Sequence, residues 1–172
     1  MFSIRIATPE DIPLIRELAA QTWEETYKDI HKEGQSEYMF KMMYSEEVLY
    51  QQMVDEGQMF FIACLEDIPT GYLAIEKTSE KTFILQKIYI IPFMQGKGLG
   101  EFMIDQGIAY LKQHYSTPFD VTLNVNRANP AVNFYKHIGF EIVDVRDRYI
   151  GNGFYMNDYV MRLPICNKGT TR

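Results

Sequence analysis

Cysteine and histidine are scarce in this sequence of 172 residues. There are two cysteines, Cys64 and Cys166, without a C-x-x-C pair, and three histidines, His31, His114 and His137. The histidines show neither the spacing of a zinc site nor an obvious nucleophile partner, so we expect no metal. Cys64 lies inside an apolar run and is most simply a small core residue.

The sequence also lacks an excess of positive charge and long apolar runs. Lysine and arginine number 17 against 23 aspartates and glutamates, a formal charge of -6, which disfavours a nucleic-acid partner. No segment reaches the roughly 20 apolar residues that span a bilayer, so we expect no membrane partner and a reducing cytoplasm. A cationic substrate suits this balance, although acidity that merely keeps the protein soluble explains it at least as well.

The rest of the composition is that of a globular domain. Hydrophobic residues make up 47% of the chain and aromatic residues 14%, which is enough for a substantial core. Because no internal repeat or linker interrupts the sequence, we expect one domain over residues 1–166. Residues 167–172 are expected to form a flexible tail.

Hydrophobic periodicity gives a coarse order of elements. The expected strands cover residues 2–7, 59–65, 71–76, 83–91, 121–125, 140–145 and 155–163. The expected helices cover residues 9–27, 38–43, 46–54, 100–115 and 130–138. Three strands follow one another between residues 59 and 91, which predicts an antiparallel meander. The polar segment 28–57 carries no strand signal.

A glycine-rich turn, Gln95-Gly96-Lys97-Gly98-Leu99-Gly100, joins the third strand of this meander to the next helix. Its glycines let the backbone approach a ligand and turn N–H groups toward it. The helix adds unpaired first-turn donors and the positive end of its dipole. We therefore predict a phosphate or pyrophosphate site rather than an ordinary turn. Neither a Walker loop nor a dinucleotide fingerprint fits the spacing.

Several short runs occur in a fixed order with this turn, namely Ile88-Tyr89-Ile90-Ile91-Pro92, Gln95 to Gly100, Asn129-Pro130-Ala131, Phe134-Tyr135 and Gly139-Phe140. In their order and spacing the chain from Ile4 to Leu163 resembles the Gcn5-related N-acetyltransferases (GNAT). Within that superfamily, the runs Glu24-Glu25-Thr26-Tyr27-Lys28 and Tyr149-Ile150-Gly151 are most similar to bacterial spermine/spermidine N-acetyltransferases of the Pai type.

The resemblance implies a single α/β domain with a mixed, mostly antiparallel twisted sheet of about seven strands flanked by helices. It implies acetyl-coenzyme A as co-substrate, no metal, and direct attack by a primary amine in a ternary complex. A polyamine, spermidine or spermine, is the first candidate acceptor. The cofactor-binding residues that it implies are Ile88, Tyr89, Ile90, Gln95, Gly96, Lys97, Gly98, Leu99, Gly100, Asn129 and Tyr135.

Two of these positions carry specific roles in the resemblance. Tyr135 is the position of the general acid for the departing thiolate, and a phenol with a pKa of about 10 can share a proton with a thiol. The alternative is a helix tyrosine that packs beside Phe134. Asn129 is the position that hydrogen-bonds the pantetheine arm. As the residue before Pro130, it could instead be a helix cap.

The general base is the open point. The acceptor amine must lose a proton before it attacks, since a free ammonium has a pKa of about 10.4. Where many relatives carry a glutamate, this chain has Gln86, which cannot act as a base. A carboxylate elsewhere or solvent must then take the proton. Gln86 could orient a water, orient the acceptor, or face the core.

The acceptor pocket has three candidate residues near the end of the first long helix. Trp23 and Tyr27 are four residues apart and could form an aromatic wall for a cationic amine, with Glu24 as counter-charge. Core packing explains Trp23 at least as well. The resemblance implies that segment 28–57 is the variable region that shapes the acceptor site, so we expect it to influence substrate choice.

Other functions stay open at this point. A peptide or protein N-acetyltransferase and a non-catalytic acyl-coenzyme A-binding regulator both fit the glycine turn, and Gln86 is the sequence support for the regulator. Pairing of an exposed edge strand or helix between protomers would give a homodimer.

Overall fold

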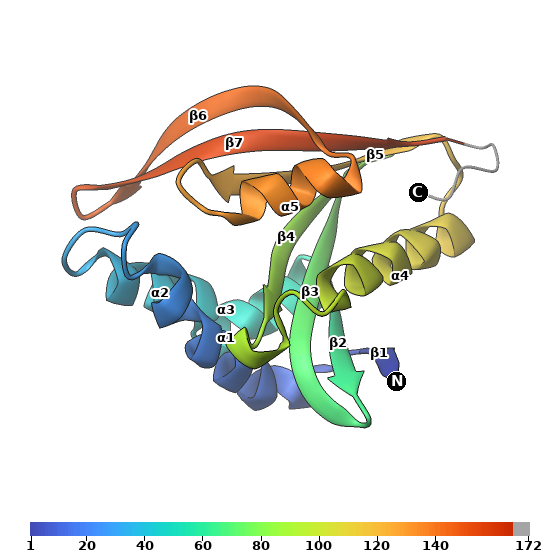
Figure 1. Cartoon of the computed structure of the whole chain (residues 1–172), viewed down its shortest axis with the longest axis horizontal. Coiled ribbons are helices and arrows are strands. Elements are labelled where there is room, and N and C mark those ends of the chain that lie inside the picture. Colours follow the sequence, from blue (N-terminus) through green and yellow to red (C-terminus); the bar gives the residue numbers. More distant parts are fainter. Residues whose placement is uncertain (167–172) are drawn as a thin grey trace. The chain divides into compact units, whose positions relative to one another are not determined.

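Seven β-strands form one mixed sheet in the order β1-β2-β3-β4-β5-β7-β6 (Figure 1). The strands are β1 Phe2–Ile6, β2 Met59–Leu65, β3 Ile68–Ser79, β4 Thr82–Ile90, β5 Phe119–Asn126, β6 Glu141–Gly151 and β7 Phe154–Ile165. The computed structural model describes residues 1–166, and the tail predicted at 167–172 lies outside the described residues. The predicted α/β class and strand number are confirmed.

Five α-helices accompany the strands within residues 1–166. They are α1 Ile12–Tyr27, α2 Gln35–Tyr44, α3 Glu46–Tyr50, α4 Leu99–His114 and α5 Ala131–Ile138. The helix expected at 46–54 is interrupted, because α3 passes into a π-helical turn at Gln51–Asp55. Ser45, a residue type that favours the N-cap position, caps α3, since its Oγ accepts a hydrogen bond from the Val48 N–H at 3.3 Å.

The described chain divides into two compact units. The first contains Met1–Glu76 and Gln86–Tyr115, and the second contains Lys77–Leu85 and the residues from Ser116 on. The glycine turn, α4 and the end of β4 therefore belong to the first unit. Helix α5 and strands β5, β6 and β7 belong to the second.

Helices cover both faces of the strands in the first unit (Figure 1). The hydroxyl groups of Tyr44 on α2 and Tyr72 on β3 are 2.7 Å apart. The next strand residue, Leu73, points the other way, where its side chain lies against Gly107 of α4. Since consecutive strand residues face opposite sides, α2 and α4 pack on opposite faces of β3.

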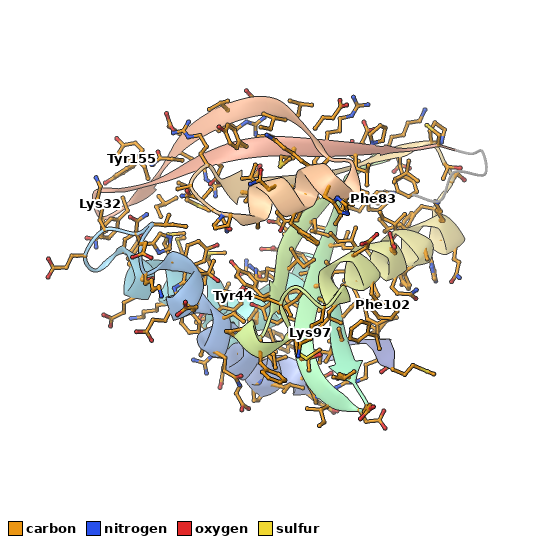
Figure 2. All side chains as sticks on the ribbon, viewed as in Figure 1. Lys32, Tyr44, Phe83, Lys97, Phe102 and Tyr155 are labelled. Carbon is orange, nitrogen blue, oxygen red and sulfur yellow. The ribbon has the colours of Figure 1, made fainter. Side chains whose placement is uncertain are left out.

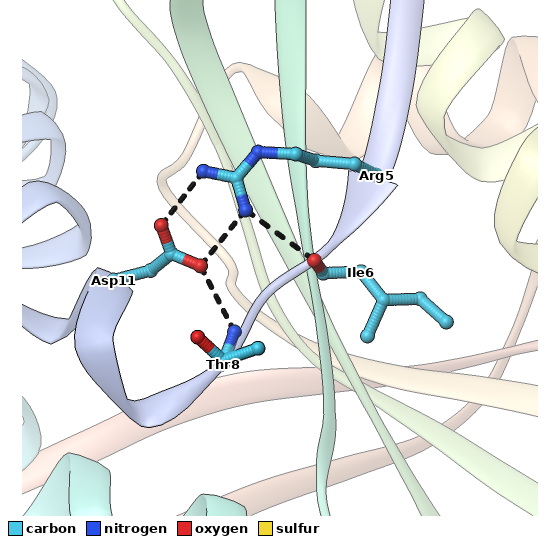
Figure 3. Close-up of polar contacts among 4 residues, drawn as sticks. All are labelled: Arg5, Ile6, Thr8 and Asp11. Carbon is cyan, nitrogen blue, oxygen red and sulfur yellow. Dashed lines mark hydrogen bonds and ion pairs between the residues drawn. The ribbon is translucent and has the colours of Figure 1, made fainter.

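A bidentate ion pair fixes the chain where β1 leads into the first helix (Figure 3). The Arg5 guanidinium donates to the Asp11 carboxylate at 2.7 and 2.8 Å, and the same carboxylate accepts the Thr8 N–H at 2.9 Å. These bonds hold the pKa of Asp11 below its usual value. Asp11 thereby supplies an acceptor for an otherwise unpaired donor at the helix start.

The second unit is built around β5, which pairs in parallel with the first half of β4 and antiparallel with β7. The rings of Phe83 and Phe119 meet edge-on at 5.1 Å between β4 and β5. Helix α5 ends at Gly139, whose φ of 117° is a conformation that side-chain-bearing residues rarely adopt. The sequence predicted this helix end.

Strand β6 is longer than the sequence predicted, and it reaches Gly151 rather than Val145. Two register shifts, at Ile142/Asp144 and Tyr149/Gly151, accompany the extra length. Charged side chains fill this part of the strand and weakened the hydrophobic signal. They are exposed, and Arg146 and Asp147 form ion pairs with Asp144 and Arg127, so a strand exposed on both faces tolerates them.

Gly71 controls how closely β3 approaches β4. A Cβ at this position would lie 2.7 Å from the Tyr89 carbonyl oxygen, which belongs to the backbone and cannot move aside cheaply. We predict that Gly71→Ala lowers the free energy of unfolding by about 2 kcal/mol, measured by denaturant titration.

The matched comparison is Gly107→Ala on α4. There the Cβ would meet only the flexible ends of Leu73 and Ile75, at 2.9 and 3.0 Å. Alanine also favours a helix by up to about 1 kcal/mol over glycine. Equal destabilisation by the two substitutions would contradict the backbone constraint at Gly71.

Candidate active site

The glycine turn has the conformation that its sequence predicted. Gly96 and Gly98 have φ values of 73° and 83°. Gly98 is the N-cap of α4, and since it has no side chain, it leaves the first N–H groups of the helix uncapped. A Cβ at either glycine would meet nothing within 4 Å, so the turn is open on that side. A 16-residue helix stands behind it with the positive end of its dipole at the turn. This geometry suits an anionic ligand.

Two side chains brace the turn in the first unit. The Gln95 amide donates to the Ile90 carbonyl oxygen at 3.3 Å and so ties the turn to the end of β4. The Lys97 ammonium lies 3.8 Å from the centre of the exposed Phe93 ring (Figure 2). The turn therefore carries a cation as well as the N–H groups that the sequence predicted to donate hydrogen bonds to an anion.

The proposed acceptor residues belong to an aromatic cluster in the same unit. The rings of Trp23 and Tyr27 are 4.6 Å apart, and the hydroxyl groups of Tyr27 and Tyr89 are 2.8 Å apart. This bond joins a predicted acceptor residue to a predicted cofactor residue. Trp23 is 5% exposed and its Nε1 donates to the Ser36 carbonyl oxygen, so it is a core residue. Glu24 is exposed.

His31 extends this cluster, although the sequence did not single it out. Its ring stacks on Tyr27 with centroids 4.3 Å apart, and its Nδ1 is 3.1 Å from the Ser36 hydroxyl. Burial lowers the pKa of His31, which favours the neutral imidazole at pH 7. The four-residue spacing from Tyr27 was the available signal, because it places both rings on one side of a continued helical turn.

Gln86 does not face the core, so that interpretation is wrong. Its side chain is exposed, and its Nε2 donates to Glu76 Oε2 at 2.7 Å. Gln58 Nε2 donates to the same oxygen at 3.3 Å. A carboxylate on β3 is therefore held directly beside the position where a base was expected. Glu76 could not be identified from the sequence because the register between two strands cannot be read from either strand alone.

Lys87 is a buried cation next to this pair. It is 4% exposed, its Nζ donates to Gln52 at 3.0 Å, and it lies 5.4 and 5.8 Å from the ring centres of Tyr44 and Phe60. Burial lowers the pKa of Lys87 to about 8, against the opposing effect of the Glu56 and Glu76 charges. Tyr44, labelled in Figure 2, is fully buried, and its burial raises the pKa of its hydroxyl.

The second unit carries Asn129 and Tyr135. Asn129 Oδ1 accepts a hydrogen bond from the Ala131 N–H at 2.9 Å, so it caps the start of α5, which was the alternative interpretation. Tyr135 is 7% exposed, and its ring packs against Phe134 and Phe140 at 5.4 and 5.9 Å. Their roles toward a cofactor stay predictions.

Two features can be checked over the part of the chain that the structure describes: clusters of metal-ligating side chains and helices that could span a membrane. Over residues 1–166, His, Cys, Asp and Glu side chains form no group of three or more that could hold a metal ion. None of the helices in this range is long and apolar enough to cross a membrane.

Comparison with known proteins identifies the class. The family model of the acetyltransferase (GNAT) domain matches residues 25–163, which include the glycine turn and both α4 and α5. The chain belongs to this family and is an N-acetyltransferase of the acyltransferase class.

Individual relatives are distant. A spermidine N(1)-acetyltransferase of Thermoplasma acidophilum is 25% identical over 82% of this chain and 89% of its own length. An uncharacterized N-acetyltransferase of Methanocaldococcus jannaschii is 24% identical over 84% of this chain, which spans 62% of that protein's length. The crystal structure of the PaiA N-acetyltransferase from Thermoplasma acidophilum in complex with coenzyme A has a TM-score of 0.81 at 22% identity. It covers 96% of this chain and 99% of its own, and confirms the fold.

The buried Lys87 ammonium predicts a specific pH dependence of stability. Its pKa is about 8 in the folded chain against 10.5 when unperturbed, so between these values the unfolded chain binds more protons and stability rises with pH. We expect the free energy of unfolding of the wild type, relative to Lys87→Met, to rise by about 2 kcal/mol from pH 7 to pH 9.5.

Urea titrations at the two pH values measure this difference. Lys112→Met removes an exposed lysine of α4 and serves as the control, for which no such change is expected. A wild-type advantage or deficit that stays constant with pH would contradict the assignment.

Proposed function

We propose that this acetyltransferase moves the acetyl group of acetyl-coenzyme A to a primary amine of a small molecule, with spermidine and spermine as first candidates. The open glycine turn at the start of α4 carries the proposal. The spermidine acetyltransferase among its relatives and the coenzyme A complex of its structural neighbour support the same chemistry.

The coenzyme would lie with its pyrophosphate on the N–H groups of Gly96 to Gly100, where the helix dipole and the Lys97 ammonium add positive charge. The pantetheine arm is amide-like, so the backbone of Ile88, Tyr89 and Ile90 could pair with it as an added strand. Donors there would also stabilise the oxyanion that forms at the thioester carbonyl.

The acceptor would lie near the aromatic cluster at the end of α1. Ring faces attract ammonium groups, and Tyr27 is partly exposed with the exposed Glu24 near it on the same helix. A polyamine carries several ammonium groups. An aromatic surface with nearby carboxylates therefore binds a polyamine better than it binds a neutral amine. The chain's net charge of -6 adds a weak long-range attraction.

In the reaction the amine nitrogen attacks the acetyl carbonyl carbon, and the carbon–sulfur bond breaks as the tetrahedral intermediate collapses. Tyr135 would protonate the departing thiolate and recover its proton from solvent. Both described cysteines are unpaired, which fits a reducing cytoplasm as the place of action.

The first test is release of the coenzyme A thiol with spermidine, spermine, a monoamine and a lysine-bearing peptide. We expect turnover with the polyamines and a fall in kcat of about 10²-fold in Tyr135→Phe, because the thiolate then leaves unprotonated. Tyr159→Phe, on β7 of the same unit, is the control and should keep wild-type activity.

Turnover with the peptide alone would replace the proposal by protein acetylation. Tight acetyl-coenzyme A binding without turnover of any amine would favour the non-catalytic regulator.

The glycine turn is tested by a matched pair of substitutions. Gly98 and Gly153 have φ values of 83° and 77°, and a Cβ at either would meet nothing within 4 Å. Both alanine variants should therefore lose about 1 kcal/mol of stability from the left-handed backbone. Only Gly98→Ala should weaken coenzyme A binding, by about tenfold in calorimetric titration. Equal coenzyme A affinities in the two variants would contradict binding of the coenzyme at this turn.

A further inference from the structure

The proposed acetylation needs a group that takes a proton from the acceptor ammonium, and the amide of Gln86 cannot do so. Gln86 lies two residues before Ile88 on β4, and its side chain binds one carboxylate, that of Glu76 on β3. We propose that Glu76 is the proton acceptor for the amine and that Gln86 holds it in place. This inference rests on the proposed function and names the base of that reaction.

The hydrogen bonds of Glu76 leave one oxygen available. Gln86 and Gln58 both donate to Oε2, at 2.7 and 3.3 Å. Within residues 1–166, Oε1 has no hydrogen-bond donor. Glu76 is partly exposed, so an ammonium or a single water can reach Oε1. A base must offer a free lone pair in a fixed direction, and the two amides on the other oxygen provide that orientation.

Two other charged groups lie in the cluster around Glu76. They are Lys87 on β4 and Glu56, which follows the π-helical turn. The negative charges of Glu56 and Glu76 both act on the Lys87 ammonium. Gln58 joins the two carboxylates, because its Nε2 lies 3.3 Å from both Glu56 Oε2 and Glu76 Oε2. The cation offsets part of the repulsion between them.

Lys87 itself is a poor candidate for the base. It is 4% exposed and its amine is directed to Gln52 and the faces of two aromatic rings. An acceptor amine could not reach it without unpacking Tyr44 and Phe60. Glu76 is the partly exposed carboxylate that touches Gln86, so the geometry selects it.

The proton balance is complete without another reagent. The ammonium gives one proton to Glu76, directly or through water, and becomes a free amine. After attack on the carbonyl carbon, the nitrogen loses a second proton to solvent as the carbon–sulfur bond breaks. The thiolate takes a proton from Tyr135, which regains one from solvent, and Glu76 returns its proton to solvent.

The decisive experiment compares pH profiles of kcat/KM for the wild type and Glu76→Gln. A glutamine at position 76 can still accept the Gln86 hydrogen bond through its carbonyl oxygen, so the local fold is preserved. At pH 7.5 we expect a fall of about 10²-fold, within the usual range for a lost general base. The deficit should shrink toward pH 10, as the free amine forms without assistance.

Three further measurements separate catalysis from structure. The double variant Glu76→Gln/Gln86→Glu moves the carboxylate to the neighbouring strand, and it should regain at least about tenfold of the lost activity. Glu80→Gln, an exposed residue in the turn between β3 and β4, should match the wild type. Coenzyme A affinity should be unchanged in all three variants.

The possible failures are distinguishable. An active wild type with Glu76→Gln within threefold of it, or reduced by one constant factor at every pH, overturns the role of Glu76 alone. A wild type that acetylates only a different amine overturns the polyamine proposal, and the same variants assayed with that amine still decide Glu76. A wild type that acetylates no amine overturns the proposed function and this inference together.

Discussion

The close approach of β3 to β4 at Gly71 is the constraint on which the first unit depends. A side chain there would collide with the Tyr89 carbonyl oxygen, so only glycine lets the two strands lie at this distance. Strand β4 carries Gln86, Lys87 and the segment Ile88–Ile90. A shift of this strand would disturb the contact between Gln86 and Glu76. It would also move Lys87 and the backbone of Ile88–Ile90, where we propose that the coenzyme binds.

Neighbouring side chains of β4 lie in different environments. Lys87 enters an aromatic enclosure with Tyr44 and Phe60, where burial reduces its affinity for a proton. Gln86 stays exposed and binds Glu76 on β3. Tyr89 bonds to Tyr27 of α1. One strand thus links a helix, a neighbouring carboxylate and a buried charge, which explains how a single substitution there could alter both stability and chemistry.

Local features of the fold could be predicted from the sequence because their causes are local. The left-handed glycines of the turn, the cap at Ser45 and the helix end at Gly139 follow from residue type alone. The lengths of β3 and β6 could not, because charged residues at exposed strand ends look like loops.

Contacts between distant segments were beyond a single sequence. Glu76 meets Gln86 only through the register of two strands, and Lys87 is buried by residues 27 or more positions away in the chain, such as Phe60. The Asn129 oxygen accepts the Ala131 N–H at the start of α5, as its position before Pro130 suggested, and its role toward the pantetheine arm stays a prediction. Residue type predicted the glycine turn and family resemblance gave the class, while the pairing that suggests a base emerged from the geometry.

The most direct test of this account is a crystal structure with coenzyme A and spermidine bound together. We expect the pyrophosphate on the N–H groups of Gly96 to Gly100 and an amine nitrogen within hydrogen-bond reach of Glu76 Oε1, or one water away. A pyrophosphate bound elsewhere, or an amine that approaches neither Glu76 nor a water bound to it, would contradict it.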